Sequence, residues 1–297
     1  MLGPMAGGRV QGMAYRRQEI GDADYLVGVA GTGTPLLLLH GFPQTHYCWR
    51  KVVPLLMRET TVVATDLRGY GATSAPPGGP KGQGYSKREL AREVVAVMTA
   101  LGFERFAVAG HDRGGRVEYR LALDHPDRVD RLAVLNVVPT LDQFERMGAG
   151  PSLAYWPWFL FAQPSPFPER LFASAREDLL GYGFDAWAET PGAIDAEAFA
   201  VYVEAFDEAT IAAACADFRA SFWVDRQDDL ADRESGRRIE CPLLAIAGAA
   251  ETQLADAGEV WRRWSTESRA LTVPGGHFIP EEAPAELATA LLKLRRA

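Results

Sequence analysis

The sequence contains few cysteines, no long apolar run and no excess of basic charge. Its three cysteines, Cys48, Cys215 and Cys241, are far apart and form no CxxC pair, which excludes a disulfide framework and a zinc cage. The apolar run at residues 36–39 ends at a His-Gly pair, well short of the length that spans a bilayer. Because 39 acidic side chains outweigh 31 basic ones, for a net charge of −8, neither nucleic acid nor an anionic membrane is an expected partner.

What remains is ordinary globular composition, with 47% hydrophobic and 24% charged residues in a chain of 297. Residues 1–12 are glycine-rich and have no charged-then-apolar signal pattern, so we interpret them as a loose leader of a cytoplasmic protein. No HxH or HExxH motif occurs, and the glycine-rich stretch at 28–33 precedes a strand pattern instead of opening a helix. We therefore expect neither a metal nor another cofactor.

Short apolar runs alternate with helical patterns, which predicts an α/β protein with a mostly parallel sheet flanked by helices. Core strands are predicted at residues 35–39, 61–66, 106–110, 131–138, 242–248 and 269–273, and an edge hairpin at 13–20 and 25–30. A capping box of Ser86 and Glu89 opens a predicted helix at 86–101, and a C-terminal helix is predicted to begin at Pro284.

The strand rhythm stops between residues 140 and 236. This stretch is rich in aromatic residues, proline and alanine, and it contains helical patterns such as the one at 198–206. Because strand patterns resume at residue 242, we expect a helical cap inserted after the sixth strand. The predicted organisation is therefore an α/β core at 13–139 and 237–297, with the cap at 140–236.

Residues 110–114 (Gly-His-Asp-Arg-Gly) follow one predicted strand and precede a helical pattern. This is the context of a nucleophile elbow, a turn so tight that a Cβ at either glycine position would clash. Asp112 then stands at the nucleophile position. The alternative interpretation is an ordinary turn between strand and helix that happens to contain glycines.

Two further loops indicate the same site. Residues 40–43 (HGFP) follow another strand, and the backbone N–H groups of Phe42 and Arg113 would together form a two-donor oxyanion hole. Of the five histidines, only His277 follows both the elbow and the last strand, where the general base of such a site belongs. A plain loop and a structural histidine are the alternatives.

An aspartate in place of serine changes the chemistry. Attack of a carboxylate on an ester carbonyl gives a mixed anhydride, whereas attack on a saturated carbon gives an ordinary alkyl ester. Water activated by His277 would then hydrolyse that ester at the Asp112 carbonyl. The expected substrate is a small molecule with an sp³ electrophile, either a carbon–halogen bond or an epoxide.

Arg113 and Arg116 open the helix after the elbow, where cations oppose the helix dipole at a cost of up to about 1 kcal/mol each. This placement favours an anionic substrate group, since paired guanidinium groups suit a carboxylate. Two solvated arginines are the alternative. The aromatic run YWPWFLF, which includes Tyr155 and Trp158, is expected to wall the pocket, and Trp187 is a further substrate-binding candidate.

At these residues the chain resembles the fluoroacetate (haloacetate) dehalogenases of the α/β-hydrolase superfamily. The likeness covers nearly everything after the leader, and it rests on residues 40–49, 66–71, 110–116, 119–123, 132–140, 162–164 and 276–284. Epoxide hydrolases share two of these motifs, HGFP and DLRGYG. The resemblance implies an α/β-hydrolase fold, Asp112 as nucleophile, His277 as base, and Arg113 and Arg116 as the binders of a substrate carboxylate.

The chain departs from the family pattern at three positions. Asn136 replaces the acid that partners the histidine, and Pro157 and Phe218 replace two of the three halide donors. Trp158 is the donor that survives, and Phe218 stays a candidate for contact with the substrate. Because fluoride depends most on hydrogen bonds, we expect chloro- or bromo-acids to react better than fluoroacetate.

A substitute for the missing acid follows the next-to-last strand. Glu251, in Gly-Ala-Ala-Glu, stands where other α/β-hydrolases, including epoxide hydrolases, have their acid. We therefore expect Glu251 to orient His277, with Asp256 in reserve and Asn136 as a neutral neighbour. The alternative is a loop carboxylate and a broken triad.

Three functions remain open. The leading one is a 2-haloacid dehalogenase that acts on a halogenated carboxylate through an alkyl ester on Asp112. The second is an epoxide hydrolase with the same Asp–His pair, which needs two cap tyrosines to protonate the opening oxygen. Candidates for these are Tyr155, Tyr182 and Tyr202. The third is a catalytically silent binding protein of the same fold, and a homodimer is left open.

Overall fold

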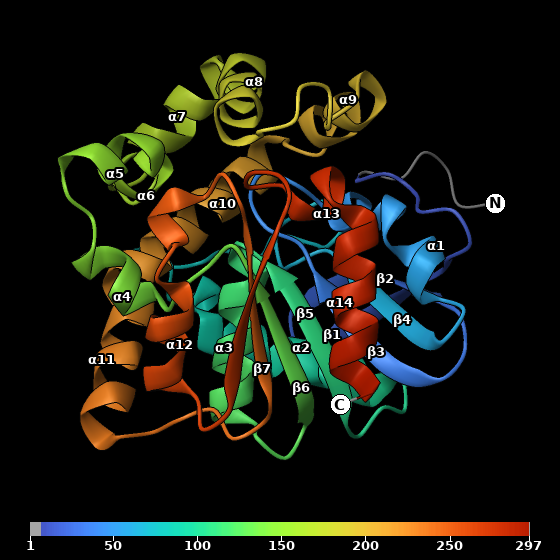
Figure 1. The fold of residues 1–297 in the computed structure, drawn as a ribbon. Helices are drawn as coiled ribbons and strands as arrows, with labels where there is room; N and C mark the ends of the chain where they lie inside the picture. The colour runs from blue at the N-terminus through green and yellow to red at the C-terminus, as the bar shows by residue number, and fades with distance from the viewer. Residues whose placement is uncertain (1–6, 297) are drawn as a thin grey trace.

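A single sheet forms the centre of the protein, and the computed structural model describes residues 7–296 (Figure 1). The eight-stranded sheet has the order β1-β2-β4-β3-β5-β6-β7-β8. β1 pairs antiparallel with β2, β2 pairs antiparallel with β4, and the other neighbours run parallel. The strands are β1 (Ala14–Ile20), β2 (Ala23–Ala30), β3 (Thr34–Leu39), β4 (Thr60–Thr65), β5 (Phe106–His111), β6 (Val129–Leu135), β7 (Leu243–Gly248) and β8 (Ser268–Val273).

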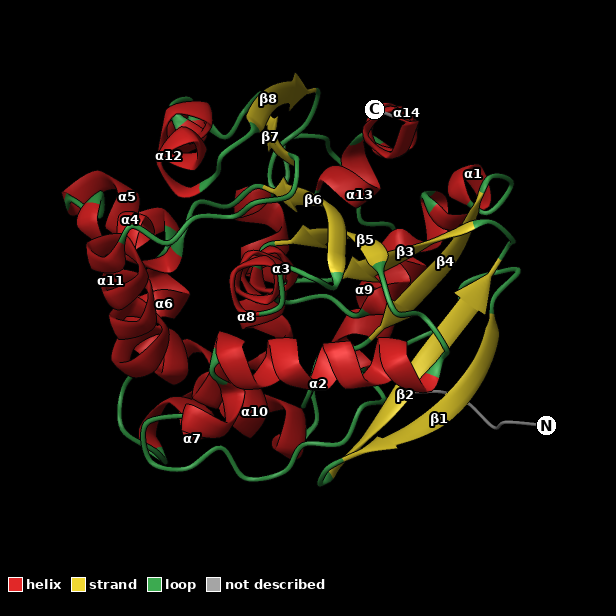
Figure 2. Cartoon of the chain, turned by 90° about the horizontal axis from the view of Figure 1, so that it is seen from below, coloured by secondary structure: helices red, strands yellow, loops and turns green. Residues whose placement is uncertain are grey.

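Helices cover both faces of this sheet. They are η1 (His46–Lys51), α1 (Val53–Leu56), η2 (Gln83–Tyr85), α2 (Lys87–Ala100), α3 (Arg113–Asp124), η4 (Thr252–Leu254), α12 (Ala257–Trp264), α13 (Ile279–Glu282) and α14 (Pro284–Arg296). Figure 2 shows α2 and α3 on one side of the strands and α13 and α14 on the other.

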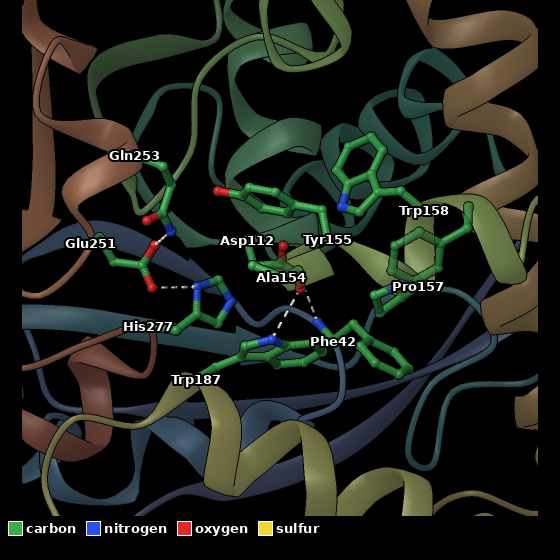
Figure 3. A pocket seen from close by; sticks show the side chains of 11 residues that line it. Phe42, Asp112, Ala154, Tyr155, Pro157, Trp158, Trp187, Glu251, Gln253 and His277 are labelled. Atoms are coloured by element: carbon green, nitrogen blue, oxygen red, sulfur yellow. Dashed lines mark hydrogen bonds and ion pairs between the residues drawn. The ribbon is translucent and has the colours of Figure 1, made fainter. Parts of the chain in front are cut away.

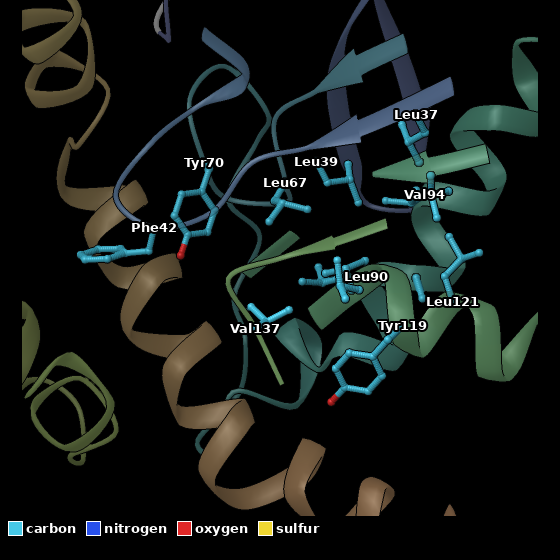
Figure 4. Close-up of a cluster of buried hydrophobic side chains, with 14 of the residues drawn as sticks. Leu37, Leu39, Phe42, Leu67, Tyr70, Leu90, Val94, Tyr119, Leu121 and Val137 are labelled. Carbon is cyan, nitrogen blue, oxygen red and sulfur yellow. The ribbon is translucent and has the colours of Figure 1, made fainter. Parts of the chain in front are cut away.

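The leucines of β3 explain why both faces need a cover. Leu36 and Leu38 belong to a buried cluster with residues of α1 and α14, whereas Leu37 and Leu39 belong to a second cluster with residues of α2 and α3. Figure 4 shows this second cluster around Leu37, Leu39 and Leu90. Successive side chains of a strand point to opposite faces, so a run of leucines is stable only in a sheet that is covered twice.

The predicted elements are found close to their expected bounds. Ser86 Oγ accepts a hydrogen bond from the Glu89 N–H at 3.4 Å and caps α2 as predicted. The reciprocal bond of a capping box is not made, because the Ser86 N–H donates to the Gln83 carbonyl oxygen and the Glu89 carboxylate accepts from Arg92. α14 begins at Pro284, as expected. β6 is the exception, because it ends at Leu135 and not at residue 138. Asn136 has a φ of +54°, which turns the chain out of the sheet although two valines follow it.

The chain between β6 and β7 is helical; in Figure 1 helices α5 to α10 lie above the sheet, whereas α4 and α11 lie beside it at the left. We call this part the helical insertion. It contains α4 (Thr140–Glu145), α5 (Ala149–Ala154), α6 (Trp156–Leu160), α7 (Phe167–Ser174), α8 (Arg176–Trp187), α9 (Ala196–Glu204), α10 (Glu208–Ala220), the π-helical turn η3 (Ser221–Asp225) and α11 (Arg226–Ser235). The position of the insertion is that predicted after the sixth strand.

The N-terminal segment differs from the loose leader that its glycines suggested. Residues 1–6 of that leader lie outside the described residues, but Gly7 and Val10 are buried against the core. Val10 is 2% exposed, and its N–H donates to the Tyr15 hydroxyl at 2.8 Å. The Thr45 hydroxyl donates to the Gly7 carbonyl oxygen at 2.8 Å. Apolar burial and these two bonds hold a segment whose composition alone indicated freedom.

Between residues 7 and 296, the structure has no helix with the length and apolarity that crossing a bilayer requires. The same range contains no cluster of three or more His, Cys, Asp or Glu side chains that could hold a metal ion.

Candidate active site

A sharp turn between β5 and α3 presents Asp112. Its φ of +47° and ψ of −111° lie outside the regions that L-residues favour, at a cost of about 1–3 kcal/mol. The flanking glycines make this turn sterically possible. A Cβ on Gly114 would lie 2.5 Å from the carbonyl oxygens of Leu39 and His40. A Cβ on Gly110 would lie 2.4 Å from Oε2 of Glu118 in α3. The predicted strand–turn–helix elbow is therefore present.

The loop after β3 meets this elbow. The Phe42 N–H donates to Asp112 Oδ1 at 2.8 Å, and Gly41 approaches so closely that a Cβ there would lie 2.4 Å from the Asp112 Cβ. Arg113 is the first residue of α3, so its N–H is one of the free donors at the amino end of a helix. The backbone donors that the sequence predicted for an oxyanion hole thus lie on the two segments that border Asp112.

His277 and Glu251 approach each other in the same cavity. Nδ1 of His277 lies 3.6 Å from Oε1 of Glu251, and the two side chains are 13% and 9% exposed. A dashed line marks this pair in Figure 3. Glu251 follows β7, as predicted, and the Gln253 amide donates to its other carboxyl oxygen. Asp256, the reserve acid, lies elsewhere, because it pairs with Arg146 at 2.8 Å and its side chain is 57% exposed.

The backbone of the His277 loop is held from the ends of β5 and β6. His111, at the end of β5, has Nε2 2.7 Å from the His277 carbonyl oxygen. Burial lowers the pKa of His111 to about 3, so this ring is neutral. Asn136 donates from Nδ2 to the carbonyl oxygens of Gly276 and His277 at 2.9 and 2.8 Å, and it accepts from the Gly248 N–H at 2.9 Å. Asn136 therefore contacts the backbone of His277 and not its imidazole.

Charges around the cavity set the ionisation of these groups. Burial alone would raise the pKa of Asp112, but the positive charges of His277, Arg113 and Arg116 outweigh it, so the pKa lies below its ordinary value. Burial alone would lower the pKa of His277, but Glu251 and Asp112 outweigh it, so this pKa lies above the usual 6.5. Asp112 is thus an anion, and His277 retains a proton more firmly than a free imidazole.

The cavity is small, about 40 Å³, and mostly aromatic. Its lining comes from loops after the strands and from the helical insertion (Figure 3). The lining residues are Phe42, Asp112, Ala154, Tyr155, Pro157, Trp158, Trp187, Phe218, Glu251, Gln253 and His277. Only a small substrate fits such a space, and the aromatic walls exclude bulk water.

The two arginines do not line this cavity, contrary to the contact expected of them. Arg113 is fully buried, and its guanidinium donates to Asp217 Oδ2 at 2.7 Å and to the Ser221 hydroxyl at 2.6 Å. Arg116 donates to the Val138 carbonyl oxygen at 2.8 Å. The Trp158 ring lies 5.0 and 4.4 Å from the two guanidinium carbons, which places it between the arginines and the cavity.

Comparison with known proteins places this architecture. A family model of the α/β hydrolase fold matches residues 34–284. The chain belongs to the α/β-hydrolase family. It is 39% identical to a fluoroacetate dehalogenase from Burkholderia sp, over 95% of this chain and 93% of that protein, and 30% identical to a soluble epoxide hydrolase from Corynebacterium sp, over 86% and 87%. A solved structure from Nostoc sp PCC 7120, provisionally described as an α/β hydrolase, has a TM-score of 0.92 at 40% identity and covers 95% of this chain and 98% of its own. These comparisons confirm the predicted resemblance to the fluoroacetate dehalogenases and epoxide hydrolases of this family.

Within this α/β hydrolase, two of the three departures from the dehalogenase pattern face the cavity. Pro157 and Phe218 line it and offer no hydrogen-bond donor. Trp187 lines it too, but its indole N–H donates to the Ala154 carbonyl oxygen at 3.2 Å. Figure 3 shows the indole nitrogen of Trp158 turned toward Tyr155, so this N–H faces the interior.

Sequence reasoning missed three residues that shape this site. Gln253 lines the cavity and bonds Glu251, Asp217 holds Arg113, and Glu282 accepts backbone hydrogen bonds beside His277. Gln253 belongs to no motif, and the motif that places Phe218 begins at Asp217 but does not indicate that its carboxylate binds Arg113. Glu282 is part of the shared stretch at residues 276–284, which gave no indication of what its side chain binds.

Proposed function

We propose that this α/β hydrolase displaces halide from a small 2-haloacid through an ester on Asp112. The observation that carries the proposal is an aspartate at a strained elbow, in one small cavity with His277 and Glu251. Because Asp112 Oδ1 accepts the Phe42 N–H, Oδ2 is the oxygen free to attack the halogen-bearing carbon. A C–O bond forms as the C–X bond breaks, and the halide leaves with the bonding pair.

Water then hydrolyses the ester. Neutral His277 takes one proton from water as the oxygen attacks the Asp112 carbonyl carbon, and negative charge develops on Oδ1. The N–H groups of Phe42 and Arg113 bind that charge, and Glu251 balances the imidazolium. Collapse of the intermediate releases a hydroxy acid and restores the carboxylate. The net reaction converts a haloacid and water into a hydroxy acid, halide and a proton.

Unpaired nitrogens of the two arginines support a carboxylate substrate. Among residues 7–296, Arg113 Nη1 and Arg116 Nε have no hydrogen-bond partner, and no carboxylate forms an ion pair with Arg116. Burial, joined by the nearby Arg113 charge, lowers the pKa of Arg116, as expected for a cation without its anion. A substrate carboxylate would supply that anion once the Trp158 indole moves aside.

The carboxylate role has its own test. Arg116→Gln is expected to raise KM for chloroacetate about 10- to 100-fold and to leave KM for an uncharged epoxide or haloalkane unchanged. Arg92→Gln, which alters an exposed residue of α2, is the matched control and should behave as the wild type. An unchanged KM for chloroacetate in Arg116→Gln would remove the carboxylate from the proposal.

An epoxide hydrolase is the second candidate, and Tyr155 favours it. Tyr155 lines the cavity, and burial raises its pKa to about 12, so it keeps a proton to donate. The other two tyrosines that this reaction would use lie elsewhere. Tyr182 is 60% exposed, and buried Tyr202 donates to Glu281 at 2.6 Å. The lack of a second tyrosine in the lining places this candidate after the dehalogenase.

A silent binding protein is the third candidate. Replacement of the usual acid by Asn136 favours it, but the position of Glu251 beside His277 counts against it. One trapping experiment with a His277 variant distinguishes all three candidate functions. His277→Ala removes the base, so an ester should accumulate on Asp112 and be visible as added mass.

The His277→Ala protein is incubated separately with chloroacetate and with a small epoxide, and the modified peptide is mapped. His125→Ala, a histidine variant outside the cavity, is the control and should accumulate no ester. We expect the chloroacetate adduct on the peptide with Asp112. An adduct with the epoxide alone would establish the second candidate, and no adduct with either compound would favour a silent protein.

A further inference from the structure

A carboxylate next to His277 joins two segments that lie far apart in sequence. Glu282, the last residue of α13, accepts hydrogen bonds from the N–H groups of Gly276 and Phe278, both at 3.0 Å. It also accepts the N–H groups of Glu189 and Thr190, both at 2.9 Å, from the loop that follows α8. One side chain thus ties the loop of the base to the helical insertion.

The two segments also touch backbone to backbone. The His277 N–H donates to the Trp187 carbonyl oxygen at 2.9 Å. A Cβ on Gly276 would lie 2.7 Å from that same oxygen and 2.8 Å from the Glu189 nitrogen. Gly275, with a φ of +100°, makes room for the Glu282 side chain, because a Cβ there would lie 2.8 Å from the Glu282 Cβ. Glycines at 275 and 276 permit this close approach.

The loop that Glu282 holds continues a wall of the cavity. Trp187 lines the cavity, and its ring centroid lies 5.9 Å from that of His277. Its indole N–H reaches across to Ala154, another lining residue. The position of this wall and the position of the base therefore depend on the same carboxylate.

We propose that Glu282 is a positioning residue that fixes His277 and the Trp187 wall in one arrangement and thereby sets the rate of ester hydrolysis. This inference rests on the proposed function. Hydrogen bonds from N–H groups to a carboxylate are charge-assisted and about twice as strong as neutral ones. A base must be held within about 0.5 Å of its productive position, and a displacement of about 1 Å can lower the rate about 100-fold.

Glu282 also acts on His277 through its charge. The groups that face the imidazole are Glu251 at 3.6 Å, Asp112 across the cavity, the neutral ring of His111 at 4.7 Å between centroids, and Glu282. Against the lowering effect of burial, the three carboxylates raise the pKa of His277. Removal of one of them should therefore lower that pKa.

The experiment compares Glu282→Gln with Glu286→Gln, which neutralises an exposed glutamate at the start of α14. In Glu282→Gln the amide nitrogen must face backbone N–H groups. We expect kcat to fall about 10-fold with KM within about twofold, ester to accumulate on Asp112, and the midpoint of the pH profile of ester hydrolysis to move to lower pH. Glu286→Gln should match the wild type in all of these.

Glu282→Asp separates reach from charge and provides a second variant if Glu282→Gln does not fold. It should lose part of kcat while keeping the raised pKa of His277. Wild-type kcat and pH profile in Glu282→Gln would overturn the proposal, and so would a loss of activity that follows unfolding with no ester on Asp112.

Two measurements without substrate separate this inference from the proposed function. In Glu282→Gln, NMR titration should give a lower pKa for His277 than in Glu286→Gln, and the amides of residues 187–190 should exchange faster. If neither differs, Glu282 does not position the base, whatever the reaction. If both differ but His277→Ala traps no ester, the proposed function fails and the positioning role stands.

Discussion

Replacement of Glu251 by glutamine removes the charge that faces His277 and keeps the shape of the side chain. The two groups are 3.6 Å apart and little exposed. Unit charges at that separation attract by about 4–5 kcal/mol at an effective dielectric constant of about 20. A glutamine dipole retains part of this, so we expect a loss of about 2–4 kcal/mol in the transition state of ester hydrolysis. That corresponds to a rate about 30- to 1,000-fold lower.

A rapid-quench assay tests this magnitude because it measures ester formation and ester hydrolysis separately. Formation involves Asp112 and not the base, so Glu251→Gln should form the ester at a rate within about threefold of the wild type. Hydrolysis should slow by the factor above, and ester should accumulate. If hydrolysis instead stays within about threefold of the wild type, Glu251 is a loop carboxylate and the acid of this triad lies elsewhere.

Asn136→Asp gives the complementary test, because Asn136 stands where the resemblance places the acid. Its amide donates to the carbonyl oxygens of Gly276 and His277, so a carboxylate would set negative oxygens against them. We expect Asn136→Asp to lose about 2–4 kcal/mol of stability in urea unfolding and not to restore turnover to Glu251→Gln. Restored turnover in the double variant would assign the acid position to residue 136, directly after β6.

Three further predictions follow from the site. Because the base must be neutral, ester hydrolysis should fall as the pH decreases through the pKa of His277; in the free enzyme, where Asp112 is an anion, NMR titration should place that pKa above 6.5, and a value at or below 6.5 would contradict this. Phe218→Tyr adds a donor to the cavity lining, so ion chromatography should detect more fluoride release relative to chloride than for the wild type, and an unchanged ratio would count against the halide argument. Asp217→Asn leaves buried Arg113 without its anion and should cost about 3–5 kcal/mol in urea unfolding, whereas Asp256→Asn, at an exposed pair, should stay within about 1 kcal/mol.

Most of the fold could be predicted from the sequence because its strands are local apolar runs with clear ends. The exceptions depend on contacts that composition does not contain. The valines after Asn136 look like strand, yet the φ of +54° at Asn136 ends β6 early. The glycines of the N-terminal segment predict a flexible backbone, yet Val10 is buried in a cluster with residues from distant parts of the chain.

Some residues of the candidate site could likewise be predicted from the sequence, whereas others could not. Asp112, Phe42 and His277 stand in motifs with fixed chain order, and Glu251 follows a predicted strand, so their meeting in one cavity could be anticipated. The environment of Arg113 could not, because its ion-pair partner Asp217 lies 104 residues away in α10 and no motif indicates that the two side chains meet. Cavity lining by single side chains depends on helix packing in the insertion, which sequence periodicity does not specify.

A single turnover in water enriched in ¹⁸O tests the central claim most directly, with enzyme in excess over chloroacetate. If an ester forms on Asp112 and water attacks its carbonyl carbon, the first turnover places ¹⁸O in the Asp112 carboxylate and the product hydroxyl keeps an oxygen from the enzyme. Mass analysis of the peptide with Asp112 should then detect the label, with unlabelled hydroxy acid. Label in the product and none in the peptide would mean that water attacks the substrate directly, which would contradict the account.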